Sequence, residues 1–115
     1  MPFLELQTNQ TLTSEKEAAF LDAATAALAD ALQKPERVFM SVAHSGLNLR
    51  MGGSADPAAV LDLDALGVPD GQTNALTELL TNLVVDHLGV PPERIFVRFQ
   101  NYERSMWGCN GKTFA

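Results

Sequence analysis

Disulfide chemistry is the first thing that the sequence excludes, because Cys109 is the single cysteine in 115 residues. An intrachain disulfide or a two-cysteine redox motif needs a second cysteine, so we expect a cytoplasmic protein. Histidine is nearly as scarce, and His44 and His87 have no ligand partners at metal-binding spacing. We therefore expect no metal site.

Basic residues are also in the minority, since 8 lysines and arginines stand against 14 aspartates and glutamates, for a formal net charge of −6. That balance argues against general affinity for nucleic acid or an anionic membrane. The N-terminal region has no basic segment followed by an apolar run, so no signal peptide is evident. No apolar stretch approaches the length of a membrane span.

Hydrophobic residues make up 46% of the chain, which is enough to form a core. The order of predicted strands and helices also occurs twice. We expect one domain over residues 1–115, built from pseudo-repeats at about 1–53 and 54–115. The repeat is visible in letters, because Pro-Glu-Arg-Val-Phe at Pro35–Phe39 is matched by Pro-Glu-Arg-Ile-Phe at Pro92–Phe96.

The first half predicts a strand, a helix and two further strands. Met1–Thr8 alternates apolar and polar side chains, which indicates a strand. Ser14 is predicted to cap a helix, with Glu17 completing a capping box. The near-continuous apolar run at Val38–Ala43 predicts a strand buried on both faces, and alternation over Leu47–Met51 predicts a short third strand.

The second half predicts a strand at Ala58–Leu63, a helix over about Gln72–Leu88 and a strand at Ile95–Phe99, with Gly89 ending the helix. Right-handed crossovers make each β-α-β pair parallel. The fold class is therefore α/β (α+β): a tandem β-α-β repeat with a four-stranded mixed sheet and two helices on one face. Because the strands are so apolar, we expect other subunits to bury the uncovered face.

Pro2 is a candidate for chemistry. If the initiator methionine is removed, Pro2 carries a terminal secondary amine whose direction is fixed by the strand behind it. An α-amino group has an ordinary pKa of about 7.7–8.0, and apolar surroundings or cations lower it. A rigid, partly desolvated amine suits a general base at neutral pH. The alternative is that proline is merely tolerated at the start of a strand.

Several landmarks in order over the whole chain resemble the macrophage migration inhibitory factor family of the tautomerase superfamily. They are Met1-Pro2-Phe3, Thr8-Asn9, Lys34-Pro35, Gly52-Gly53-Ser54, Pro57, Leu66-Gly67, Pro92-Glu93-Arg94 and the tail from Gly108 through Asn110 to Phe114-Ala115.

The resemblance implies a homotrimer with active sites between subunits and cofactor-independent keto–enol tautomerisation of phenylpyruvate-like 2-keto acids. It implies that Pro2 is the catalytic acid/base, that Leu66 offers a backbone amide, and that neighbouring subunits contribute to each pocket. The implied substrate-binding residues are Lys34, Leu66, Phe96, Arg98, Val38, Trp107 and Phe114. For Lys34, a cation that complements the end of the first helix is the alternative reading, and both roles are compatible.

The departures from the family pattern leave alternatives open. Phe96 replaces a common tyrosine, and Arg98 either binds a carboxylate or points to solvent. Cys109 replaces a tryptophan, part of whose space Trp107 is expected to fill. A hydratase, dehalogenase or decarboxylase acting on a small acid would need a carboxylate to activate water. Asp62 and Asp64 are interpreted as a solvated loop edge, which leaves no candidate.

A receptor-binding cytokine mimic is the alternative from a different class. Some relatives leave cells without a signal peptide, so its absence does not decide between the two classes.

Overall fold

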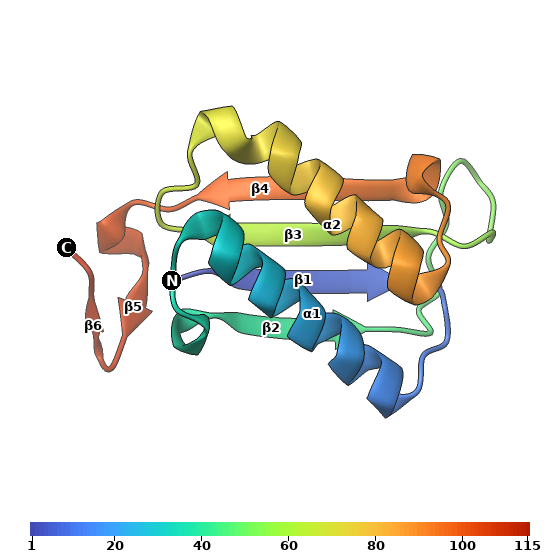
Figure 1. The fold of residues 1–115 in the computed structure, drawn as a ribbon, viewed down its shortest axis with the longest axis horizontal. Helices are drawn as coiled ribbons and strands as arrows, with labels where there is room; N and C mark the ends of the chain where they lie inside the picture. Colours follow the sequence, from blue (N-terminus) through green and yellow to red (C-terminus); the bar gives the residue numbers. More distant parts are fainter.

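The computed structural model describes all residues, 1–115, as a sheet covered on one side by two helices (Figure 1). The principal strands are β1 (Phe3–Thr8), β2 (Met40–His44), β3 (Ala59–Ala65) and β4 (Ile95–Asn101), and the helices are α1 (Ser14–Leu32) and α2 (Thr73–Leu88). Short 3₁₀ turns precede β2, α2 and β4, and the tail forms a small hairpin of β5 (Gly108–Cys109) and β6 (Lys112–Thr113).

The sheet is four-stranded with the order β2-β1-β3-β4. β1 and β2 are parallel, β3 and β4 are parallel, and β1 runs antiparallel to β3. Each helix connects one parallel pair, as the sequence predicts, and the two pairs meet at β1 and β3. The N-terminus therefore leads into a central strand that is hydrogen-bonded on both sides, which fixes the direction of the residues before it.

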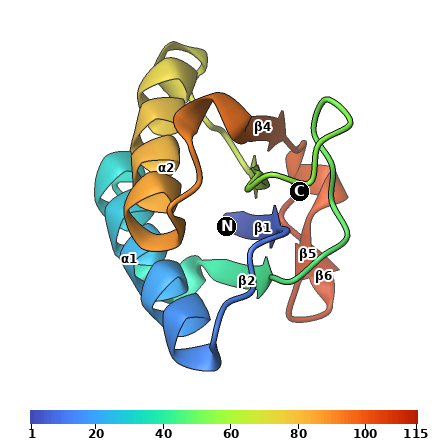
Figure 2. The same ribbon diagram turned by 90° about the vertical axis from the view of Figure 1, so that its right-hand side faces the viewer.

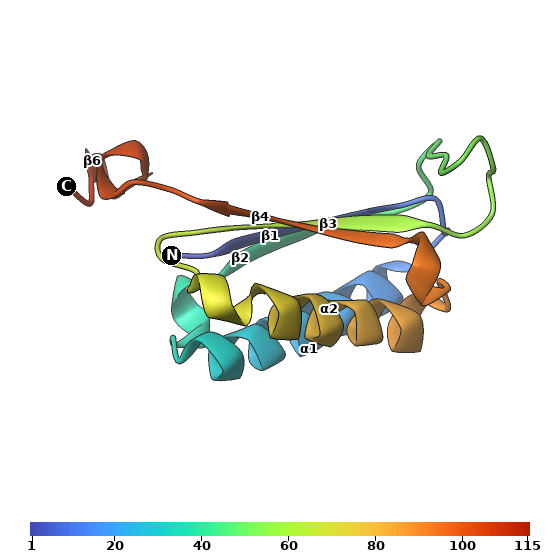
Figure 3. The same ribbon diagram turned by 90° about the horizontal axis from the view of Figure 1, so that it is seen from above.

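Figure 3 shows both helices on one side of the sheet. Most of the buried core residues are leucines and alanines. Leu4 and Leu6 of β1 and Leu61 and Leu63 of β3 point into the layer between the sheet and the helices, because side chains alternate along a strand. Both helices present a stripe at helical spacing: Phe20, Ala24 and Leu28 from α1, and Leu76, Leu80, Val84 and Leu88 from α2. Neither helix is long and apolar enough to cross a membrane.

The ends of the helices differ in detail from the sequence prediction. Thr13, not Ser14, is the N-cap of α1, and its side chain accepts a hydrogen bond from the Lys16 amide at 3.2 Å. The predicted capping box is wrong, because the Glu17 carboxylate instead accepts a hydrogen bond from the Ser45 hydroxyl at 3.0 Å. Gly89 ends α2 in the left-handed conformation, with φ 70°, as predicted.

The strand predicted over Leu47–Met51 does not form, because no strand of this chain lies beside it. Residues 45–58 form a loop that contains only an isolated bridge between Met51 and Ser54. The Arg94 side chain donates hydrogen bonds to the carbonyls of Pro57, Met51, Ser54 and Asp56 at 2.9–3.2 Å. The loop is therefore held by hydrogen bonds from its carbonyls to one partly buried guanidinium rather than by a strand ladder.

The face of the sheet away from the helices, called the open face below, differs from the prediction. We expected an apolar face, but Glu5, His44, Asp62, Asp64 and Arg98 project from it. The leucines of β1 and β3 alternate with these charged residues and lie on the covered face, whereas Phe3 and Val60 remain on the open face. β2 is an edge strand in this chain, and Met40 is 68% exposed, so burial of β2 on both faces is also not found.

Two irregular segments rise over the open face at opposite ends of the sheet (Figures 2 and 3). The 45–58 loop lies at the end where β3 and β4 begin, and the C-terminal hairpin lies at the end where β1 begins. Each segment forms one wall of a concavity, so the open face has a hollow at each end.

Candidate functional site

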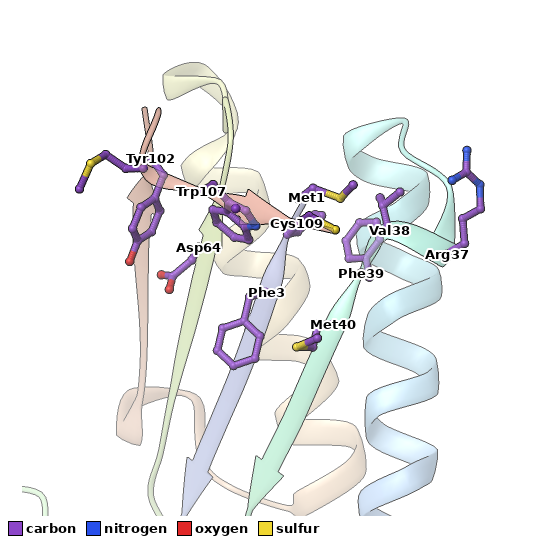
Figure 4. A pocket seen from close by; sticks show the side chains of 13 residues that line it. Met1, Phe3, Arg37, Val38, Phe39, Met40, Asp64, Tyr102, Trp107 and Cys109 are labelled. Atoms are coloured by element: carbon purple, nitrogen blue, oxygen red, sulfur yellow. The ribbon is translucent and has the colours of Figure 1, made fainter. Parts of the chain in front are cut away.

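The larger hollow, called the N-terminal cavity below, has a volume of about 720 Å³ and lies at the start of β1 (Figure 4). Nine of its thirteen lining residues are hydrophobic. They come from the N-terminus, from the segment leading into β2, from the end of β3 and from the tail. The lining residues are Met1, Pro2, Phe3, Arg37, Val38, Phe39, Met40, Asp64, Tyr102, Met106, Trp107, Gly108 and Cys109.

Pro2 is fully buried and is held by its neighbours. Its carbonyl accepts a hydrogen bond from the Met40 amide at 3.1 Å, which ties it to the edge strand. The chain's terminal amine, on Met1, lies next to it, and burial followed by the positive charge of Lys34 holds the pKa of that amine below its ordinary value. The environment at the start of β1 therefore favours a neutral amine.

Lys34 lies on the helix side of the N-terminus, just beyond the end of α1. The left-handed conformation of Gln33, with φ 54°, turns the chain away from the helix and lets the Lys34 amide donate to the Ala29 carbonyl at 3.0 Å. Its ammonium donates to the Leu66 carbonyl at 3.1 Å, directly after β3. The Lys34 side chain thus joins α1 to the end of β3 beside the N-terminus, and its backbone, rather than its charge, closes the helix.

Asp64 is a carboxylate in this cavity that the sequence interpretation missed. The register of β1 with β3 places it opposite Phe3, one residue from Pro2. Burial, and then the like charges of Asp62 and Glu5, raise the pKa of the Asp64 carboxyl, while contact with the Tyr102 hydroxyl and the charge of Arg98 oppose that rise. The interpretation of Asp64 as a solvated loop edge is therefore wrong. Its alternation with Leu63 and Ala65 was the signal that placed it inside a strand.

Tyr102 and Trp107 form the wall beside Asp64 (Figure 4). The Tyr102 amide donates to the Ala65 carbonyl at 2.9 Å, so the chain remains attached to β3 just beyond β4. The two rings pack edge to face, with centroids 5.2 Å apart and planes at 89°. Cys109 lines the same cavity two residues after Trp107.

The predicted site residues do not all meet in one place. Pro2, Val38 and Trp107 line the N-terminal cavity, and Lys34 and Leu66 lie beside it, joined by their hydrogen bond. Phe114 lies in the tail, where its amide donates to the carbonyls of Arg104 and Trp107, each at 3.1 Å, and the Arg104 guanidinium lies 6.0 Å from the ring centroid.

Phe96 and Arg98 lie elsewhere, in the smaller hollow of about 310 Å³ beneath the 45–58 loop. Phe96 is 58% exposed, and the Arg98 Nε donates to the Asp62 carboxylate at 2.5 Å. Phe96 lies four residue steps along β4 from Gln100, the partner of Asp64, which corresponds to about 13 Å along a strand. Within one chain, Phe96 is therefore too far from Pro2 to contact the same small molecule. Arg98, in the middle of β4, is bonded to Asp62 and does not line the N-terminal cavity.

The four-stranded sheet with two helices on one face is the fold of the macrophage migration inhibitory factor proteins, a family of the tautomerase superfamily. The family model for macrophage migration inhibitory factor (MIF) matches residues 1–115, and the chain belongs to that family. It is 36% identical to the macrophage migration inhibitory factor homolog of Brugia malayi over the full length of both chains. The family includes tautomerases and cytokines.

Solved structures agree with this assignment. The crystal structure of the homologue from Prochlorococcus marinus has a TM-score of 0.93, covers 98% of this chain and 99% of that one, and at 24% identity supports the fold alone. Macrophage migration inhibitory factor from Toxoplasma gondii is 31% identical, with a TM-score of 0.87 and coverage of 97% and 99%.

Proposed function

We propose that this protein is a cofactor-independent keto–enol tautomerase for phenylpyruvate-like 2-keto acids, with the Pro2 amine as general acid/base. The observation that supports it most is the environment of the N-terminus. Burial and the charge of Lys34 lower the pKa of the terminal amine, which in this structure is that of Met1 at the edge of an apolar cavity, and removal of Met1 would place the Pro2 amine in the same surroundings. Such an amine is available as a base near neutral pH.

The proposed step moves one proton. The Pro2 nitrogen takes a proton from C3 of the keto acid, the C3–H electron pair forms the C2=C3 double bond, and the carbonyl π electrons move onto oxygen. Protonation of that oxygen gives the enol, and the reverse sequence gives the ketone. A positive charge close to the developing enolate lowers the barrier, and Lys34 is the cation whose charge acts on the terminal amine.

The rest of the cavity suits the aryl tail. Val38, Phe39, Met40 and Trp107 supply apolar wall, which favours burial of an aromatic ring. Lys34 is placed to attract the substrate carboxylate from the helix side, and the backbone of Leu66, which follows β3, lies at the same end. A substrate would then lie with its carboxylate toward Lys34 and its ring toward the open face.

We further propose that the active protein is a homotrimer in which a neighbouring copy completes the site. Phe96 lies at the other end of the open face, out of reach of the substrate of its own chain, and Arg98 lies in the smaller hollow, where it is bonded to Asp62. A second copy that brought its Phe96 end against the N-terminal cavity would supply the missing wall and a guanidinium, and Phe114 would lie near that junction. Light scattering that gave a stable monomer of about 12.4 kDa would contradict this assembly.

The decisive experiment concerns the N-terminus. Intact mass would first establish that Met1 is absent from the purified protein. Phenylpyruvate tautomerisation would then be compared between that protein and a form extended by one residue before Pro2, which turns the amine into an amide. We expect the extension to reduce turnover by about 10²–10⁴-fold with the oligomer intact. Equal rates in the two forms would show that Pro2 is not the base.

One observation supports a second candidate, the hydration of a small unsaturated acid. Asp64 provides the carboxylate in the cavity that the sequence interpretation did not find. It could take a proton from water as the oxygen adds to C3, while the protonated Pro2 amine delivers a proton to C2. With a 3-haloacrylate, the adduct would then lose halide. Halide release that is lost in Asp64→Asn would favour this candidate over the tautomerase.

A further inference from the structure

We propose that Asp64 is a specificity-determining residue that excludes substrates carrying a second anionic group on the aryl tail. The proposal rests on the tautomerase function and extends it by naming which 2-keto acids the site accepts. The side chain lies in the N-terminal cavity between Tyr102 and Phe3 (Figure 4), on the open face to which the substrate's ring would extend. Nothing in the chemistry of proton transfer to Pro2 requires a carboxylate there.

The charges around the cavity are arranged on two sides. Lys34 follows α1, and its ammonium donates to the Leu66 carbonyl just beyond β3, outside the residues that line the cavity, whereas Asp64 lies on the open face and lines the cavity. The keto acid's own carboxylate is therefore drawn toward Lys34 and repelled by Asp64. A tail with a second negative charge would meet Asp64 directly, and a neutral tail of the same size would not.

Cations near Asp64 do not cancel this charge in the chain. Arg98 is the closest on the open face, and its Nε is bonded to Asp62. Arg37 also lines the cavity, but its guanidinium points away from Asp64 (Figure 4). Glu5 and Asp62 add negative charge, and Tyr102 offers a hydroxyl without charge. Within one chain, the field on the tail side of the cavity is therefore negative, and an Arg98 brought to the cavity by a neighbouring copy would arrive already bonded to the Asp62 of that copy.

The test uses two tails of similar shape, 3-(4-methylsulfonylphenyl)pyruvate, which is neutral at the ring, and 3-(4-sulfophenyl)pyruvate, whose sulfonate stays ionised at every pH used. Trp107 is the single tryptophan and lines the cavity, so its fluorescence reports Kd independently of turnover. In the wild-type protein at low ionic strength, we expect the sulfonate to bind more weakly than the sulfone, on the order of tenfold.

Asp64→Asn should bring the two Kd values within about twofold, because it removes the charge and keeps the shape. Asp64→Glu should preserve the difference. Glu5→Gln is the matched control, since it removes one negative charge from the same face outside the cavity, and it too should preserve most of the difference. Lowering the pH should narrow the difference in the wild type as Asp64 takes up a proton, and should not change it in Asp64→Asn.

Two results would overturn the proposal: equal discrimination in the wild type and Asp64→Asn, or an equal loss in Glu5→Gln, which would assign the effect to the whole face. Different results would contradict the proposed tautomerase function. Discrimination in binding without any tautomerisation of phenylpyruvate by the Pro2 form would support the role of Asp64 while removing the tautomerase assignment. Turnover of both substrates with equal Kd values would support the tautomerase assignment and contradict the role of Asp64.

Discussion

On the helix-covered face of the sheet, Leu4 and Leu6 of β1 are fully buried, whereas on the open face of the same strand Phe3 and Glu5 remain partly exposed. β3 repeats the contrast, with Leu61 and Leu63 inside and Asp62 and Asp64 outside. Because successive side chains of a strand point to opposite faces, one strand contributes both to the buried core and to the open face. The covered face provides most of the folding free energy, and the open face is left free for the cavity and its charges.

The largest loss of stability is expected from a substitution on the covered face. Phe20 of α1 is fully buried in the core. Phe20→Ala should lower the free energy of unfolding by about 3–5 kcal/mol, because it removes apolar burial and leaves a hole. Urea denaturation would measure it. The matched open-face change, Phe3→Ala, should cost less, since Phe3 is partly exposed; equal costs would break the distinction between the faces.

A smaller effect is expected from the loop that borders the second hollow. Arg94→Gln removes the guanidinium that donates to four loop carbonyls. Hydrogen bonds from a charged donor are the stronger kind, so we expect a loss of about 2 kcal/mol in unfolding free energy. Hydrogen exchange should show increased opening of residues 45–58 in particular. An unchanged loop with the same loss of stability would place the effect in β4 instead.

The covered face was largely predictable from the sequence, and the open face was not. Helical stripes such as Leu76, Leu80 and Val84, and the order of strands and helices, determine which pairs are parallel and which side is covered. Alternation over Leu47–Met51 also predicts a strand, but a strand needs a neighbouring strand, and this chain supplies none at that position. A local sequence pattern therefore predicts a strand correctly when the strand that pairs with it belongs to the same chain.

The candidate site shows the same division. Pro2, Val38 and Trp107 line one cavity as expected, because the N-terminus and the tail meet at the end of β1. Asp64 was missed, although its alternation with Leu63 could be read, because which hollow an outward side chain reaches depends on the path of a tail forty residues later. Phe96 and Arg98 could not be placed with Pro2 from the sequence, since that would depend on a second copy.

At the boundary between the faces, Lys34 should affect catalysis more than stability. Lys34→Gln removes a positive charge beside the terminal amine and a hydrogen bond to Leu66. We expect KM for phenylpyruvate to rise roughly tenfold, with a small change in Tm. Because a nearby cation disfavours the protonated amine, its removal should raise the amine pKa and move the rising limb of the pH–rate profile to higher pH. A large drop in Tm with unchanged KM would make Lys34 a structural residue.

The smallest expected effect is the change in stability caused by neutralising Asp64 on the open face. Burial and the charges of Asp62 and Glu5 raise the pKa of this carboxyl in the folded state, so the folded protein holds its proton more tightly than the unfolded chain does. Stability from that proton is complete below the ordinary pKa of aspartate and is lost as the pH rises through the folded value. Asp64→Asn, which mimics the neutral form, should therefore raise Tm slightly at pH 7 and lose that advantage at about pH 3.

Asp62→Asn is the control on the same strand and face. Asp62 is paired with Arg98, so removing its charge should give no gain at pH 7. A gain of equal size in both variants would mean that the open face is destabilised by its total negative charge and that Asp64 is not distinguished by its cavity. A gain in Asp64→Asn alone would show that the protein tolerates a carboxylate that costs stability at this position, as expected of a residue whose role is in ligand selection rather than in folding.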